Sequence, residues 1–146
     1  MTAQRQPQTV AAPTTQQLLL QQSFLAFDFG TKRVGVATGN RLLQTATAQR
    51  TVTSTGDARF ADIAQLVAQW QPDALVVGVP FHPDGAEHEN TLRARKFGRQ
   101  LGGRLNLPVH EVDERFSTTE ALSQGAHDAD AASACIILEQ FLRSLP

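Results

Sequence analysis

The spacing of hydrophobic residues changes along the chain and marks out the expected elements. Residues 24–29 form an apolar run that is broken only by Asp28 and closed by Gly30, which predicts a buried strand. Residues 34–38 and 42–52 follow over tight connections and are rich in Val, Thr and Leu, which predicts two further strands. Three strands joined in this way predict an antiparallel meander.

Helical and strand-like patterns alternate after the meander. Apolar residues at three- and four-residue spacing predict a helix that ends before Pro72. Its expected core residues are Phe60, Ile63, Ala64, Val67 and Trp70. Residues 74–79 predict a buried strand, 89–104 a second helix and 107–112 a further strand.

The chain ends in a third amphipathic pattern. Residues 129–143 predict a helix, and Ser117 to Glu120 has the spacing of a capping box at a helix start. The inward-facing residues of the final helix are expected to be Ala134, Ile137, Leu138 and Phe141. Helices between the later strands imply right-handed parallel crossovers, whereas the meander is antiparallel. The fold class is therefore predicted as α/β, a mixed five-stranded sheet with helices on both faces.

Composition divides the chain into two parts. Residues 1–22 contain seven glutamines and a single charged residue, Arg5, which predicts a disordered extension before one domain over residues 23–146. The lone Cys135 cannot form an internal disulfide, so we expect a reducing, cytoplasmic compartment. No apolar run approaches the roughly 18 residues of a membrane span. The net charge of −1 means that nucleic-acid binding would need a local basic patch.

Carboxylates in unusual places are the main candidates for chemistry. Asp28 lies inside a core strand, where a charge needs a cation, a metal ion or hydrogen-bond donors as a partner. A salt bridge to Lys32 or Arg33 would satisfy that need without any catalytic role. Asp113 and Glu114 end a later strand, and strand alternation lets at most one of them face the same crevice as Asp28.

A third acidic position precedes the final helix. Asp128 and Asp130 could cap that helix or act as ligands. Carboxylates that converge from two strands and a helix suit Mg²⁺ or Mn²⁺, which prefer oxygen ligands. The hypothesis that follows is two-metal hydrolysis of phosphodiesters.

Basic residues that could hold a polyanion occur in two places. Lys32 and Arg33 follow Asp28 on a predicted turn, and Arg95 and Arg99 share one face of the predicted 89–104 helix. An ordinary solvated helix face is an equally good interpretation of the second group.

Four motifs in order resemble the YqgF/RuvX family. They are Phe27-Asp-Phe-Gly-Thr-Lys-Arg-Val-Gly-Val-Ala37, Val77-Gly-Val-Pro80, Asp113-Glu-Arg-Phe-Ser-Thr-Thr-Glu-Ala121 and Asp130-Ala-Ala-Ser-Ala-Cys-Ile-Ile-Leu138. Members of this family are described as bacterial pre-16S rRNA nucleases and as Holliday-junction-resolvase-like proteins. The resemblance covers about residues 23–145. It implies an RNase H-like fold, a divalent metal and a role in maturing the 5′ end of small-subunit rRNA during ribosome assembly.

The resemblance also implies roles for particular residues. Asp28 matches the first-strand aspartate of this fold, and Asp130 matches the carboxylate that opens the final helix. The second acid would come from the Asp113–Glu114 motif, with Glu114 favoured over Asp113. Arg115 and Lys32 would contact phosphate or steady the carboxylates. The segment from Ser123 to Ala129 is shorter and more acidic than in similar proteins, which weakens the expected grip on substrate there.

Two other functions compete with a metal-dependent endonuclease acting on structured RNA. One is a Holliday junction resolvase acting on branched DNA, which would normally work as a symmetric dimer. The other is a non-catalytic factor that binds pre-ribosomal RNA through the basic helix. Whether the chain is a monomer or a homodimer stays open from the sequence.

Overall fold

The fold is built on a five-stranded mixed sheet with strand order β3-β2-β1-β4-β5. A computed structural model describes residues 21–114 and 129–146. The strands are β1 (Ser23–Phe29), β2 (Val34–Asn40), β3 (Ala46–Ala48), β4 (Ala74–Val79) and β5 (Val109–Asp113). β1 pairs antiparallel with β2 and parallel with β4, and β4 pairs parallel with β5. The antiparallel flank and the parallel half both agree with the predicted topology.

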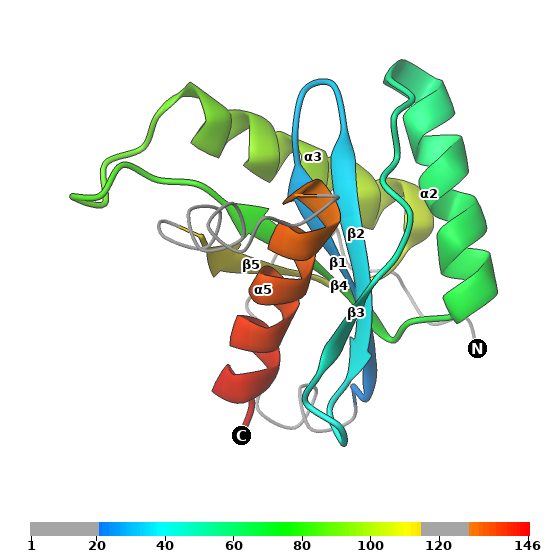
Figure 1. The fold of residues 1–146 in the computed structure, drawn as a ribbon. Helices are drawn as coiled ribbons and strands as arrows, with labels where there is room; N and C mark the ends of the chain where they lie inside the picture. Colours follow the sequence, from blue (N-terminus) through cyan, green and yellow to red (C-terminus); the bar gives the residue numbers. More distant parts are fainter. Residues whose placement is uncertain (1–20, 115–128) are drawn as a thin grey trace, which may run out of the picture.

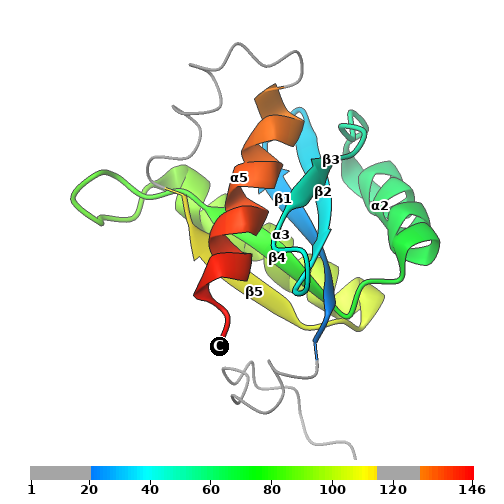
Figure 2. The same ribbon diagram turned by 60° about the horizontal axis from the view of Figure 1, so that its bottom comes forward.

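Helices cover both faces of this sheet. They are α2 (Gly56–Trp70), α3 (Glu89–Leu105) and α5 (Ala129–Ser144). Helix α5 crosses one face, while α2 and α3 lie on the other, as Figures 1 and 2 show. The predicted layout of an α/β sheet with helices on both faces is therefore confirmed. No helix in the described ranges 21–114 and 129–146 is long and apolar enough to cross a membrane.

Two hydrophobic cores follow from the alternation of side chains along β1. Leu25 and Phe27 face α2 and α3, where they join Ile63, Phe97 and Leu101 in one cluster. Phe24 and Ala26 face α5 and join the second cluster with Ala134, Ile137, Leu138 and Phe141, the inward residues expected of the last helix. The same alternation places Asp28 on the α5 face of the sheet.

The third strand is much shorter than the sequence pattern predicts. Of residues 42–52, only Ala46–Ala48 form β3, and Val52 makes an isolated bridge to Val34. A local turn competes with strand pairing here. The Leu43 amide donates to Asn40 Oδ1 at 2.8 Å, and Gln44 takes a left-handed φ of 56°. The prediction of a long strand over 42–52 is wrong for this reason.

Trp70 is not a core residue, contrary to the prediction. It is the last residue of α2, and 42% of its surface is exposed. Gln71 leaves the helix in the left-handed region at φ 47°. Trp70 therefore lines a surface groove together with Thr38 and Leu43 instead of continuing the buried face of the helix.

The described chain begins with residues that are already packed. The Gln21 side chain is buried and lies 2.7 Å from His110 Nε2, and His110 in turn stacks on Phe141. The capping-box segment from Ser117 and the first 20 residues lie outside the described ranges.

Candidate active site

Asp28 lies near the carboxyl end of β1, between two glycines on the neighbouring strands. It pairs in register with Gly35 of β2 and with Gly78 of β4. A Cβ at Gly35 would overlap the Asp130 carbonyl, and a Cβ at Gly78 would lie 3.0 Å from Glu114 Oε2. The missing side chains therefore leave room for acidic residues from α5 and from the end of β5 to approach Asp28.

Glu114 reaches this space because of strand alternation. Its amide donates to Val79 O at 3.2 Å, which extends the β4–β5 pairing by one residue. Val112 belongs to the α5-side core, so Glu114, two residues later, points to the same side. Only 6% of Glu114 is exposed, and its Oε2 has no hydrogen-bond partner among the described residues.

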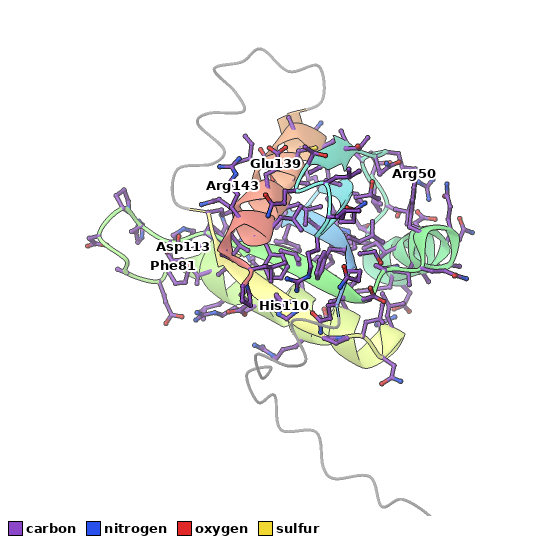
Figure 3. All side chains as sticks on the ribbon, turned by 90° about the horizontal axis from the view of Figure 1, so that it is seen from below. Arg50, Phe81, His110, Asp113, Glu139 and Arg143 are labelled. Carbon is purple, nitrogen blue, oxygen red and sulfur yellow. The ribbon has the colours of Figure 1, made fainter. Side chains whose placement is uncertain are left out.

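Asp113 points away from this space. It pairs in register with Val79, is exposed and lies at the outer end of β5 (Figure 3). Of the two acids that the sequence left open, the structure therefore brings Glu114 to Asp28, and the charge of Asp113 adds to the raised pKa of Glu114.

Burial makes Asp28 and Glu114 weak acids, and the charges of neighbouring carboxylates add to the effect. Burial raises the pKa of Asp28 to about 6, and the charge of Asp130 adds to the effect. Burial also raises the pKa of Glu114 to about 9, with the charge of Asp28 as the next cause. Glu114 therefore holds its proton near neutral pH and can share it with Asp28, as expected of two carboxyl groups that cannot easily both be charged.

Asp130 joins the same region from the first turn of α5. Its Oδ2 lies 3.1 Å from Arg33 Nε, and its charge contributes to the raised pKa of Asp28. The sequence left open a non-catalytic salt bridge from Asp28 to Lys32 or Arg33. In the structure, the acidic partner of Arg33 is not Asp28. Arg33 instead pairs with the third acidic residue of the set.

The carboxylate oxygens around Asp28 are suitable ligands for a hard divalent cation. Glu114 offers a buried carboxylate oxygen to which none of the described residues donates a hydrogen bond, and Asp28 lies beside it. A cation between two buried carboxylates would favour their charged forms, which burial otherwise disfavours. In the described part of the chain, no three His, Cys, Asp or Glu side chains already stand together as a metal site. Asp130, the natural third ligand, is engaged with Arg33.

The predicted basic residues have different surroundings. Lys32 and Arg33 are exposed on the β1–β2 turn, on the side of the molecule from which Asp130 approaches. Arg99 is exposed on α3, which covers the opposite face of the sheet. Arg115 lies outside the described residues.

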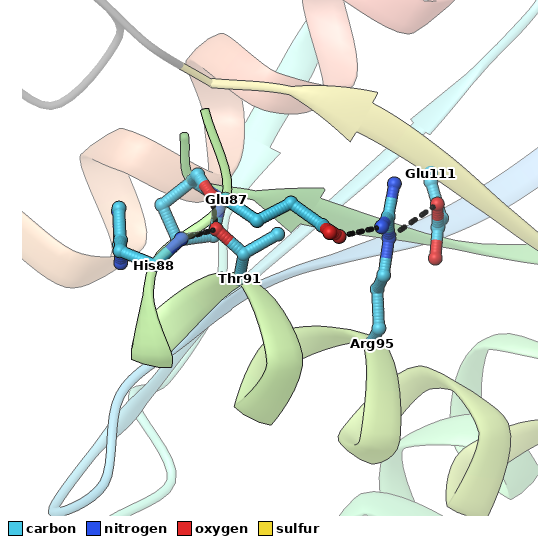
Figure 4. A network of polar contacts seen from close by, with 6 residues as sticks. Glu87, His88, Thr91, Arg95 and Glu111 are labelled. Carbon is cyan, nitrogen blue, oxygen red and sulfur yellow. Dashed lines mark hydrogen bonds and ion pairs between the residues drawn. The ribbon is translucent and has the colours of Figure 1, made fainter. Parts of the chain in front are cut away.

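Arg95 is occupied by contacts within the protein. It forms ion pairs with Glu87 of the loop after β4 and, at 3.4 Å, with Glu111 of β5 (Figure 4). Its guanidinium also lies over the Phe81 ring, 5.3 Å from the centroid. These contacts tie the 80–88 loop to the helix and the sheet, so Arg95 serves the structure of this loop and is not a free cation.

Arg59 is a residue that our sequence analysis missed. It is buried and donates to Gly30 O, Thr31 O and Ser54 O at 2.9–3.0 Å. These bonds fix the turn that follows Asp28 and carries Lys32 and Arg33. A signal was available in the sequence, because Arg59 lies four residues before Ile63 on the apolar face of its helix.

Several known proteins are similar in sequence to this chain. The family model described as "RuvX: Holliday junction resolvase" matches residues 22–144. Proteins named "Putative pre-16S rRNA nuclease" are similar to the chain. The one from Albidiferax ferrireducens is 71% identical over 124 residues, covering 85% of this chain and 80% of the relative. The one from Polaromonas sp. is also 71% identical, over 86% of this chain and 91% of the relative.

Solved structures support the fold. Thermus thermophilus RuvC in complex with a Holliday junction substrate matches with a TM-score of 0.55 at 16% identity, over 84% of this chain and 94% of RuvC. A second Thermus thermophilus RuvC structure matches with the same TM-score. This likeness confirms the predicted RNase H-like fold. Since the family model covers nearly all of the domain and relatives are 71% identical to it over the aligned residues, the chain belongs to the YqgF/RuvX family of nucleases.

Proposed function

We propose that this protein is a metal-dependent endonuclease that hydrolyses phosphodiester bonds in structured RNA, acting in 5′-end maturation of pre-16S rRNA during ribosome assembly in the cytoplasm. The observation that carries the proposal is the buried Asp28–Glu114 pair, with Asp130 approaching it from α5. The names of the relatives support the choice of RNA substrate.

Asp28, Glu114 and Asp130 are the residues that would hold Mg²⁺ or Mn²⁺. When bound, the metal supplies an activated water and stabilises the charge that develops on the leaving oxygen. Lys32 and Arg33 lie on the exposed turn beside these acids, where they would bind and orient the phosphate backbone. The buried location of Asp28 and Glu114 keeps bulk water away from the charged groups.

Cleavage of an RNA that spans the 5′ end of mature 16S rRNA tests the proposal. With Mg²⁺ or Mn²⁺ present, we expect the wild type to cut it and Asp28→Asn and Glu114→Gln to lose at least about 100-fold in rate, since removal of a group that stabilises charge in the transition state has effects of this size. Asp113→Asn is the matched control, because it neutralises the adjacent acid that points away. Equal rates for all four proteins would contradict the assigned site.

A junction resolvase is the second candidate, favoured by the description of the family model and by the fold shared with RuvC. The wild-type protein separates the two candidate substrates. A wild type that cuts four-way DNA junctions faster than the RNA, as a dimer in solution, would favour the resolvase. An RNA that binds but is not cut with either metal would favour a non-catalytic assembly factor.

A further inference from the structure

Arg33 is paired with an acid that the proposed nuclease needs as a metal ligand. Its Nε lies 3.1 Å from Asp130 Oδ2. The side chain of Arg33 is 65% exposed, so a phosphate arriving from solvent can reach the guanidinium while the ion pair is intact.

Backbone structure on both sides sets this ion pair. Arg59 bonds to Gly30 O and Thr31 O, each at 3.0 Å, and so fixes the turn from which Arg33 projects. Gly35 lets the backbone at Asp130 approach β2 closely, because a Cβ there would overlap the Asp130 carbonyl. The backbones of β1, β2 and α5 therefore hold the two partners near each other, so the ion pair does not depend on side-chain conformation alone.

Each partner of this ion pair could instead bind a group from outside the protein. A guanidinium binds two phosphate oxygens in a forked geometry, and a carboxylate binds a hard cation. If Arg33 moves to a phosphate, Asp130 is released, and both charges keep a partner throughout. The exchange therefore leaves neither charge unpaired, which would be the costly outcome.

We infer that Arg33 is a positioning residue that couples substrate to metal: it keeps the Asp130 carboxylate in the ion pair, and so unavailable to a cation beside Asp28 and Glu114, until a substrate phosphate binds the guanidinium instead. This inference rests on the proposed function, because it needs the three acids to be the metal ligands. It predicts that substrate binding completes the ligand set and that metal alone binds weakly.

Titration of the full chain with Mn²⁺ alone by isothermal calorimetry tests the coupling. We compare the wild type with Arg33→Gln and with Lys32→Gln, which removes the same charge from the neighbouring exposed position. Without its partner, Asp130 is free for the cation, so Arg33→Gln should bind Mn²⁺ about fivefold more tightly than the wild type, the upper range for a partly exposed ion pair. Lys32→Gln, which changes only the general field, should differ from the wild type by less than about twofold.

Each outcome has a separate meaning. An unchanged affinity in Arg33→Gln, or an equal gain in both variants, overturns the coupling even if the wild type cleaves RNA and depends on Asp28. Absence of Mn²⁺ binding in all three proteins overturns the coupling, and loss of RNA cleavage as well would remove the proposed function with it. Circular dichroism melting of each variant checks that both retain the fold, as expected for exposed positions.

Discussion

Asp28 is the residue on which the chemistry of the site depends. It lies on a core strand with Glu114 beside it, and burial raises the pKa of each carboxyl group. Two acids with pKa values of about 6 and about 9 share protons over the whole neutral range. Such a pair is costly for a fold to keep charged, and a role in holding a cation gives it a physical reason.

The raised pKa values predict that the protein becomes less stable as pH rises. Both folded-state values exceed the ordinary values of 3.8 and 4.5, so the favourable contribution is complete below about pH 4. It is lost as pH rises through about 6 for Asp28 and about 9 for Glu114. The loss due to Asp28 alone amounts to about 2–3 kcal/mol by pH 8.

Urea denaturation in EDTA at pH 4 and at pH 8 measures this loss. Asp28→Asn should be more stable than the wild type at pH 8 but not at pH 4, because it removes the buried charge and keeps the shape of the side chain. Added Mn²⁺ should raise the melting temperature of the wild type more at pH 8 than at pH 5.5, since the acids must be deprotonated to bind it. A stability that does not change with pH would show that the two acids are solvated.

Strands and helices can pack closely around Asp28 because neighbouring positions are glycines, which have no side chain. Gly35 and Gly78 flank Asp28 on the two neighbouring strands, and each leaves space for groups that arrive from α5 or β5. Pairing register, which local propensity does not specify, sets this row of residues across three strands.

Gly78→Ala should therefore destabilise the protein by about 1–3 kcal/mol through overpacking. Its Cβ would overlap Ile137 Cδ1 and approach Glu114 Oε2. The control is Gly103→Ala in α3, where a Cβ meets nothing within 4 Å and alanine favours the helix. Guanidinium unfolding of both variants provides the comparison. Equal effects of the two substitutions would mean that the packing around Asp28 can expand without lowering the free energy of unfolding.

Arg59 connects α2 to the turn between β1 and β2. Arg59→Gln removes charged donors from three backbone carbonyl groups and should lower the free energy of unfolding by about 2–4 kcal/mol. The matched control is Arg104→Gln, in the last turn of α3, because Arg104 forms an exposed ion pair with Asp57 and should contribute less than about 1 kcal/mol. Thermal melting distinguishes them, and similar losses in both would contradict the anchoring role of Arg59.

At the scale of the whole molecule, several arginines among the residues that the structure describes are already engaged with acids of the same chain. The net charge is −1, and Arg93, Arg95 and Arg104 form ion pairs with acids of the same chain. The proposed contacts in the described ranges come mainly from Lys32 and Arg33. We therefore predict that the logarithm of RNA affinity falls with the logarithm of salt concentration with a slope of only about −2 to −3. Fluorescence anisotropy between 50 and about 300 mM KCl measures it; a slope steeper than about −5 would require a basic surface beyond this turn.

The alternation of apolar and polar residues was enough to predict most of the elements. Strand β4 has the predicted bounds of residues 74–79, and α5 differs from its prediction by one residue at its end. The prediction of a long strand over 42–52 was wrong because a turn closed by Asn40 competes with strand pairing. The prediction that Trp70 lies in the core was wrong because Trp70 is the last residue of α2, and the chain leaves the helix at Gln71.

The sequence by itself determined the fold class, the family and the presence of an acid in the middle of the first strand. These features depend on residues close together in the chain and on motifs that can be read in order. Only the tertiary structure decided that Glu114, and not Asp113, meets Asp28, that Arg33 pairs with Asp130, and that Arg95 is engaged with Glu87 and Glu111. Those choices depend on strand register and on contacts between residues up to about a hundred positions apart, and no local pattern encodes them.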